Sequence, residues 1–73
     1  MKREIFRLLI ALVTHKNVYK TSDSIMKLFD CDNSKSDLIN HTLKLFLKDW
    51  DKFEYWASYD VLVKYTEEIY KII

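Results

Sequence analysis

The chain contains no glycine and no proline among its 73 residues, although both are common in average proteins. Tight hairpin turns, phosphate-binding loops and strained catalytic turns usually need glycine, because glycine adopts positive φ angles without a steric penalty. Helices need neither residue, and short polar loops of Asn, Asp and Ser can connect them. The two absences therefore favour an all-helical chain and disfavour any site built on a glycine-rich loop.

Cysteine is almost absent as well, since Cys31 is the single one. No disulfide can form within the chain, and this predicts a cytoplasmic location. Neither sign of charge dominates, because 12 basic and 11 acidic residues leave a net charge of +1. The chain therefore has no global field that would steer it toward nucleic acid or an anionic membrane.

Long hydrophobic runs are missing too. The longest stretch without a charge spans residues 8–15, whereas a membrane-spanning helix needs about 20 residues. Lys2 and Arg3 precede an apolar run, as in a signal peptide, but Arg7 interrupts it and no small-residue cleavage site follows. The start is therefore interpreted as folded sequence. The apolar content of 49% hydrophobic and 15% aromatic residues is enough to build a compact core.

Apolar periodicity predicts a compact bundle of three or four helices that forms a single helical domain over residues 1–73. A first helix is expected over residues 2–16, and its apolar residues cover nearly half of its circumference, so it needs cover on more than one side. A short second helix is expected over residues 21–30, with Thr21, Ser22 and Asp23 as candidate caps.

The third helix carries the strongest signal, because the spacing of Leu43, Phe46, Trp50, Phe53 and Ala57 alternates between three and four residues. The apolar face then changes, which predicts a break at residues 58–60 and a separate final helix. The expected core consists of ten apolar residues from three of these helices: Ile5, Leu8, Leu9, Leu12, Ile39, Leu43, Phe46, Trp50, Leu62 and Ile69.

An α+β fold is the alternative for the second half of the chain. Residues 53–56 and 61–65 are rich in aromatic and β-branched residues, which favour strands. These two strands would form a small β-wing at about residues 53–65, after three helices. The turn between them would have to form without glycine, so this fold is the second choice.

Aromatic residues are concentrated in one short stretch, where six of eleven fall within residues 46–59. If this stretch is helical, Tyr55 and Tyr59 point away from the face of Phe46 and Trp50, and Trp56 flanks that face. Clustered Trp and Tyr are typical of interface hot spots, whereas single exposed tyrosines are ordinary surface residues. Tyr55, Trp56 and Tyr59 are therefore the candidate protein-interface residues.

Residues 21–30 and 35–48 also have the order of a helix-turn-helix, in which the second helix could enter a major groove. With the β-wing, the order of elements resembles a winged helix-turn-helix transcriptional regulator. The residues that would contact nucleic acid lie on the second of these helices: Lys35, Ser36, Asn40, His41, Lys44 and Lys48. Asp37 would repel phosphate there, and the near-neutral charge also disfavours DNA binding.

Catalysis is not expected, because the chain has no phosphate loop, no convincing triad and too little length for a buried pocket beside a core. His15 and His41 lie far apart with no partners at metal spacing, so no metal or cofactor is predicted. We therefore expect a small non-catalytic regulatory or inhibitory protein that binds a protein partner, or forms a homodimer, through an aromatic helical surface. Binding to a membrane or to a small-molecule substrate is not expected, and nucleic acid is a less favoured binding partner than protein.

Overall fold

A computed structural model describes residues 2–52 and 58–73 of the chain. The described residues form four α-helices and one turn of 3₁₀ helix, in the order α1 (Lys2–His15), α2 (Val18–Leu28), η1 (Asn33–Lys35), α3 (Ser36–Lys52) and α4 (Ser58–Ile72). Helices pack on helices throughout this part of the chain, so the expected all-α bundle is confirmed.

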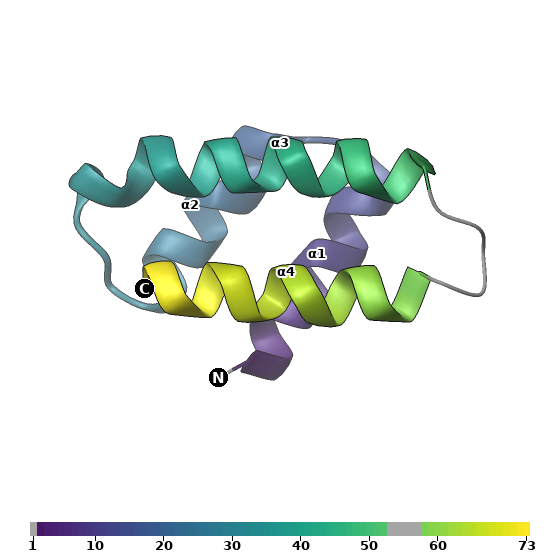
Figure 1. Cartoon of the computed structure of the whole chain (residues 1–73). Helices are drawn as coiled ribbons and strands as arrows, with labels where there is room; N and C mark the ends of the chain where they lie inside the picture. The colour runs from purple at the N-terminus through teal and green to yellow at the C-terminus, as the bar shows by residue number, and fades with distance from the viewer. Residues whose placement is uncertain (1, 53–57) are drawn as a thin grey trace.

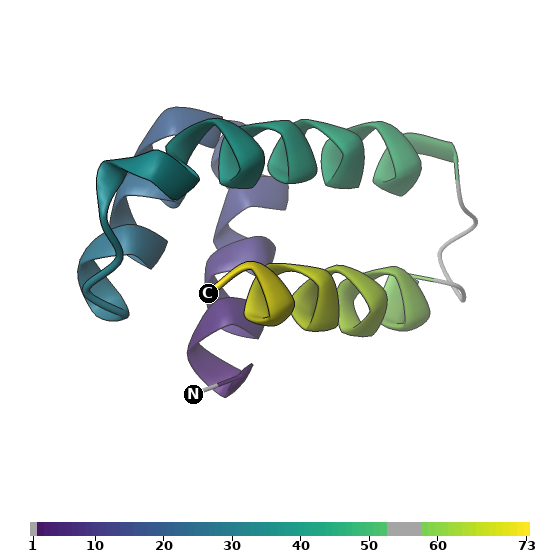
Figure 2. The ribbon, with the colours of Figure 1, turned by 60° about the vertical axis from the view of Figure 1, so that its left-hand side comes forward.

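The helices lie in two layers. Figure 1 shows α3 and α4 side by side in front, with α1 and α2 behind them and running across their direction. The turned view in Figure 2 shows the same arrangement. The radius of gyration of 11.3 Å matches the value of about 11 Å for a compact chain of this length. The crossing layers enclose one core.

Eleven apolar residues are buried in this core: Ile5, Leu9, Leu12, Ile25, Ile39, Leu43, Phe46, Val61, Leu62, Tyr65 and Ile69. Eight of the ten residues expected in the core are among them. Leu8 and Trp50 are only partly buried and pack against its edge. The expected set omitted Ile25, Val61 and Tyr65, which complete the core from α2 and α4.

The second helix begins earlier than its sequence pattern predicts. Asn17 is its N-cap, and the Asn17 side chain accepts a hydrogen bond of 3.1 Å from the backbone N–H of Lys20. The three expected caps lie inside α2 instead, with Thr21 and Ser22 buried and Asp23 exposed. The prediction was wrong because Thr21 and Ser22 fit under neighbouring helices, and burial outweighs their preference for helix ends.

The β-wing alternative is wrong. The second strand of the wing was expected at residues 61–65, which lie inside α4. The first strand was expected at residues 53–56, which lie outside the described residues. A strand would bury alternate residues on one face. In the structure Val61, Leu62 and Tyr65 are buried while Val63 is exposed, which is the pattern of a helix.

Without glycine, two other residues adopt the left-handed conformation that ends a helix. Lys16 follows α1 with a φ angle of 60°, and Asp30 follows the C-cap of α2 with a φ angle of 53°. After α2 the backbone N–H of Cys31 donates to the carbonyl oxygen of Met26 at 3.0 Å, which is the bond of a Schellman motif. Helix ends that usually rely on glycine are therefore closed here by lysine and aspartate.

None of the helices in the described part of the chain is both long enough and apolar enough to span a bilayer.

Candidate protein-binding surface

Tyr59 lies in the first turn of α4, where 67% of its surface is exposed. Its ring packs on Phe6 of α1, with ring centroids 5.9 Å apart and planes tilted by 57°. Tyr55 and Trp56, the other two candidate interface residues, lie outside the described residues. The structure therefore places one of the three candidates, at the junction of α1 and α4.

An open hollow of about 350 Å³ lies beside this aromatic pair. Residues of α1 and α4 line it: Lys2, Arg3, Phe6, Tyr59, Val63, Thr66 and Glu67. Phe6, Tyr59 and Val63 give the hollow apolar walls, and 38% of the Val63 surface is exposed. We call this feature the α1–α4 hollow.

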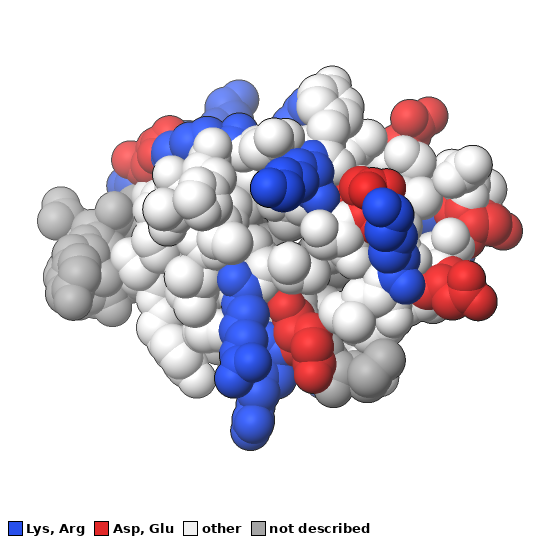
Figure 3. Space-filling model, turned by 180° about the vertical axis from the view of Figure 1, so that it is seen from behind, with Lys and Arg blue, Asp and Glu red and all other residues white. Residues whose placement is uncertain are grey.

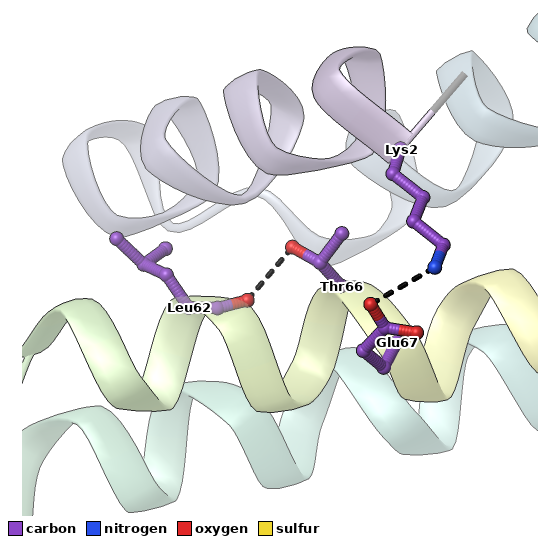
Figure 4. Close-up of polar contacts among 4 residues, drawn as sticks. All are labelled: Lys2, Leu62, Thr66 and Glu67. Carbon is purple, nitrogen blue, oxygen red and sulfur yellow. Dashed lines mark hydrogen bonds and ion pairs between the residues drawn. The ribbon is translucent and has the colours of Figure 1, made fainter.

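Most of the polar side chains at one end of the hollow have partners within the chain. Lys2 Nζ lies 3.0 Å from Glu67 Oε1 and 5.1 Å from the centre of the Tyr70 ring. Thr66 is buried and donates its hydroxyl to the carbonyl oxygen of Leu62 at 2.7 Å. Figure 4 shows the Lys2–Glu67 and Thr66–Leu62 contacts on the side of α4 that faces α1.

Arg3 differs from its neighbours. It is exposed and lines the hollow, and its guanidinium makes no ion pair with any of the described residues. Since Lys2 and Glu67 offset each other's charge, Arg3 leaves the end of the hollow with a net positive charge. The hollow thus offers an apolar cavity beside a free guanidinium.

Only part of this surface was predictable from sequence. The aromatic cluster identified Tyr59, but Phe6, Val63 and Arg3 come from a helix pairing that the spacing of residues does not define. The broad apolar arc of the first helix was the available signal, because it indicated that this helix is covered on more than one side.

The six candidate nucleic-acid contacts are on or next to α3, but several are engaged within the chain. Lys35 Nζ donates to the main-chain oxygen of Ile73 at 2.9 Å. Lys44 Nζ donates to the Tyr19 hydroxyl at 3.4 Å and lies 5.3 Å from the centre of that ring. The Asn40 side-chain oxygen is buried and has no hydrogen-bond partner among the described residues.

The other three candidates differ in exposure. Ser36 begins α3 and is half-buried, whereas His41 and Lys48 are exposed on the outer side of the helix. Exposed Leu38 and Leu45 lie on the same helix. The surface of α3 is thus less polar and less available to phosphate than the sequence suggested.

Charges of both signs occur together on the face of the molecule seen from behind (Figure 3). Figure 3 shows this face, where Lys and Arg side chains lie next to Asp and Glu side chains at several places, beside a broad uncharged area. No group of three or more His, Cys, Asp or Glu side chains in residues 2–52 and 58–73 is placed to hold a metal ion. Cys31 is a free, half-buried thiol.

Among the described residues, the titratable group with the largest pKa shift belongs to the core rather than to this surface. Burial raises the pKa of Tyr65 to about 12, and its hydrogen bond to the carboxylate of Asp49 adds to the shift. The ring also packs edge-on against Phe46, with centroids 5.5 Å apart. We interpret Tyr65 as a structural residue that joins α4 to α3.

Comparison with protein-family models, with curated proteins and with solved structures finds no match for this chain.

Proposed function

We propose that this chain is a small non-catalytic binding protein that regulates or inhibits another protein by contacting it through the α1–α4 hollow. The observation that carries the proposal is the exposed pair Tyr59 and Val63, set against Phe6 at the mouth of an apolar hollow. An apolar side chain of the partner would enter the hollow and cover these residues.

The physical basis is the area that a partner would bury. Tyr59 and Val63 leave apolar surface in water, and each Å² removed from water contributes about 25 cal/mol. Tyrosine is enriched at interface hot spots because its ring is large, rigid and polar at one end. Contact with Phe6 holds the Tyr59 ring in place, so little side-chain entropy would be lost on binding.

A non-catalytic role agrees with the chemistry around the hollow. Glu67 is the acidic residue in its lining, and its carboxylate is paired with Lys2. None of the other lining residues in the described part of the chain is a His, Cys or Asp that could act as a nucleophile or general base. A cytoplasmic location remains a prediction from the single cysteine.

The test compares Tyr59→Lys with Tyr19→Lys. Tyr19 is a matched control, because 65% of its surface is exposed but it lies on α2, away from the hollow. A photo-crosslinking amino acid at position 63 would be combined with each variant in the native cells. We expect crosslinked proteins with the unsubstituted chain and with Tyr19→Lys, and their loss with Tyr59→Lys.

Circular dichroism of both variants provides the folding control. Equal crosslinking by the two folded variants would remove the hollow as the binding surface, and so would a complete lack of crosslinked protein. A crosslink to a second copy of this chain alone would show self-association instead.

A further inference from the structure

We infer that the partner presents an acidic segment to the α1–α4 hollow, with a carboxylate bound by Arg3 beside the apolar side chain that fills the hollow. This inference rests on the proposed function and adds the chemistry of the partner. The observations that support it are the charges of the residues around the hollow.

The positive charge at Arg3 is unbalanced by its surroundings. Lys2 is paired with Glu67 at 3.0 Å and also lies over the Tyr70 ring. Glu4, the neighbouring acidic residue, already interacts with other groups. A carboxylate of the partner would therefore pair with a guanidinium that makes no ion pair among the described residues.

Arg3 also has a suitable position. It lines the hollow with Phe6 and Tyr59, and it lines a second depression of about 530 Å³ together with Lys2, Glu4 and Tyr70. Its side chain thus lies at the junction of the two depressions. A guanidinium binds carboxylates through two parallel hydrogen bonds, and such pairs fix the orientation of the ligand.

A second copy of this chain fits the hollow less well. In a two-fold symmetric dimer the same patch meets itself, so both copies would bring the same excess of positive charge, Lys2 and Arg3 against Glu67, to the interface. Like charges placed in this way oppose association. An acidic partner avoids that repulsion and also uses the free guanidinium.

Two synthetic amphipathic helical peptides test the inference. Both carry the same stripe of leucine and tryptophan, and the stripe is flanked by glutamates in one peptide and by lysines in the other. Binding is followed by nuclear magnetic resonance, through the backbone amide signals of Phe6, Tyr59 and Val63. We expect the acidic peptide to shift these signals at lower concentration than the basic peptide.

Charge-reversed variants locate the effect. Arg3→Glu should weaken binding of the acidic peptide by about fivefold or more, which is the size expected for a lost ion pair. Arg7→Glu is the matched control, because Arg7 is one turn further along α1 and lines a different depression, towards α2. Arg7→Glu should weaken binding clearly less than Arg3→Glu, because Arg7 does not line the hollow and cannot contact the bound carboxylate there.

Equal binding of the two peptides, binding of neither, or equal effects of the two variants would overturn the inference. A different result contradicts the proposed function, namely that Tyr59→Lys and Tyr19→Lys give the same crosslinked proteins. If Tyr59→Lys abolishes binding of a partner and Arg3→Glu does not weaken it, the hollow remains the proposed binding surface and only the acidic segment is ruled out.

Discussion

Lys16 and Asp30 occupy backbone positions that most helical proteins give to glycine. Their φ angles of 60° and 53° bring each Cβ close to a backbone oxygen, at a cost of about 1–2 kcal/mol. Aspartate tolerates this region better than lysine, because its short side chain can bond locally. The strain is therefore expected to be larger at Lys16.

Replacing Lys16 with glycine should stabilise the protein. We expect Lys16→Gly to raise the free energy of unfolding by about 1 kcal/mol, because glycine adopts positive φ without a penalty. Lys16→Ala is the control, since it also removes the exposed ion pair with Asp51 at 3.8 Å but keeps a Cβ. Urea unfolding measures both, and equal stabilities of the two variants would contradict the prediction.

Tyr65 should make the stability fall in alkaline solution. Its pKa is about 10.0 when exposed and is raised to about 12 in the folded chain, first by burial and then by Asp49. The folded state thus favours the protonated hydroxyl. This contribution is fully present below pH 10 and is lost as the pH rises from 10 to 12.

The variant Tyr65→Phe isolates this effect. It should cost about 1 kcal/mol at neutral pH, because the hydrogen bond to Asp49 is lost, and its stability should then fall less steeply between pH 10 and 12. Tyr59→Phe, at an exposed ring, should follow the unsubstituted protein. Chemical unfolding at several pH values measures the difference, and parallel curves for all three proteins would refute the role of Tyr65.

At the scale of elements, helix type and order were predictable, while helix ends and the depth of burial were not. The spacing of three and four residues between apolar positions identified α1, α3 and α4, because each of these helices buries one of its faces in the core. The start of α2 was missed, since Val18 and Tyr19 are poor helix formers in isolation and are held by packing and by the Asn17 cap. Such tertiary effects are absent from local sequence.

The outer side of α3 should not bind duplex DNA. Lys35 and Lys44 are engaged with Ile73 and Tyr19, and Asn40 has its side-chain oxygen buried. We expect no complex in a mobility-shift titration at low salt. A complex that fades steeply with salt, and less steeply in Lys48→Ala, would restore this function, because each phosphate contact contributes to the salt dependence.

At the scale of the whole molecule, the candidate surface depends on the packing of α1 against α4, which could not be predicted from the sequence alone. Tyr59 stands out in a cluster of aromatic residues, but its meaning depends on Phe6, which is more than fifty positions away in the sequence. The free charge of Arg3 likewise becomes visible only when the Lys2–Glu67 pair is known. Pairing between distant helices created the hollow, and local patterns do not encode such pairings.

The stability of the whole molecule should depend little on salt. Each ion pair found in the described residues has at least one partner whose side chain is mostly exposed, as in Lys27–Asp23 with 77% and 62%. Such pairs are worth about 0–1 kcal/mol each, and salt screens them. We expect 1 M NaCl to change the free energy of unfolding by less than about 2 kcal/mol. Urea unfolding at low and high salt checks this, and a larger loss would mean that charges hold the fold.

The contact of α1 with α4 also determines when the protein can fold during synthesis. Lys2 and Glu67 are 65 positions apart, and Ile5 and Leu9 share one core with Ile69. Because α1 leaves the ribosome before α4, its apolar side stays uncovered until α4 has been synthesised. Until translation reaches α4, a nascent chain exposes this side to chaperones and to other unfinished chains.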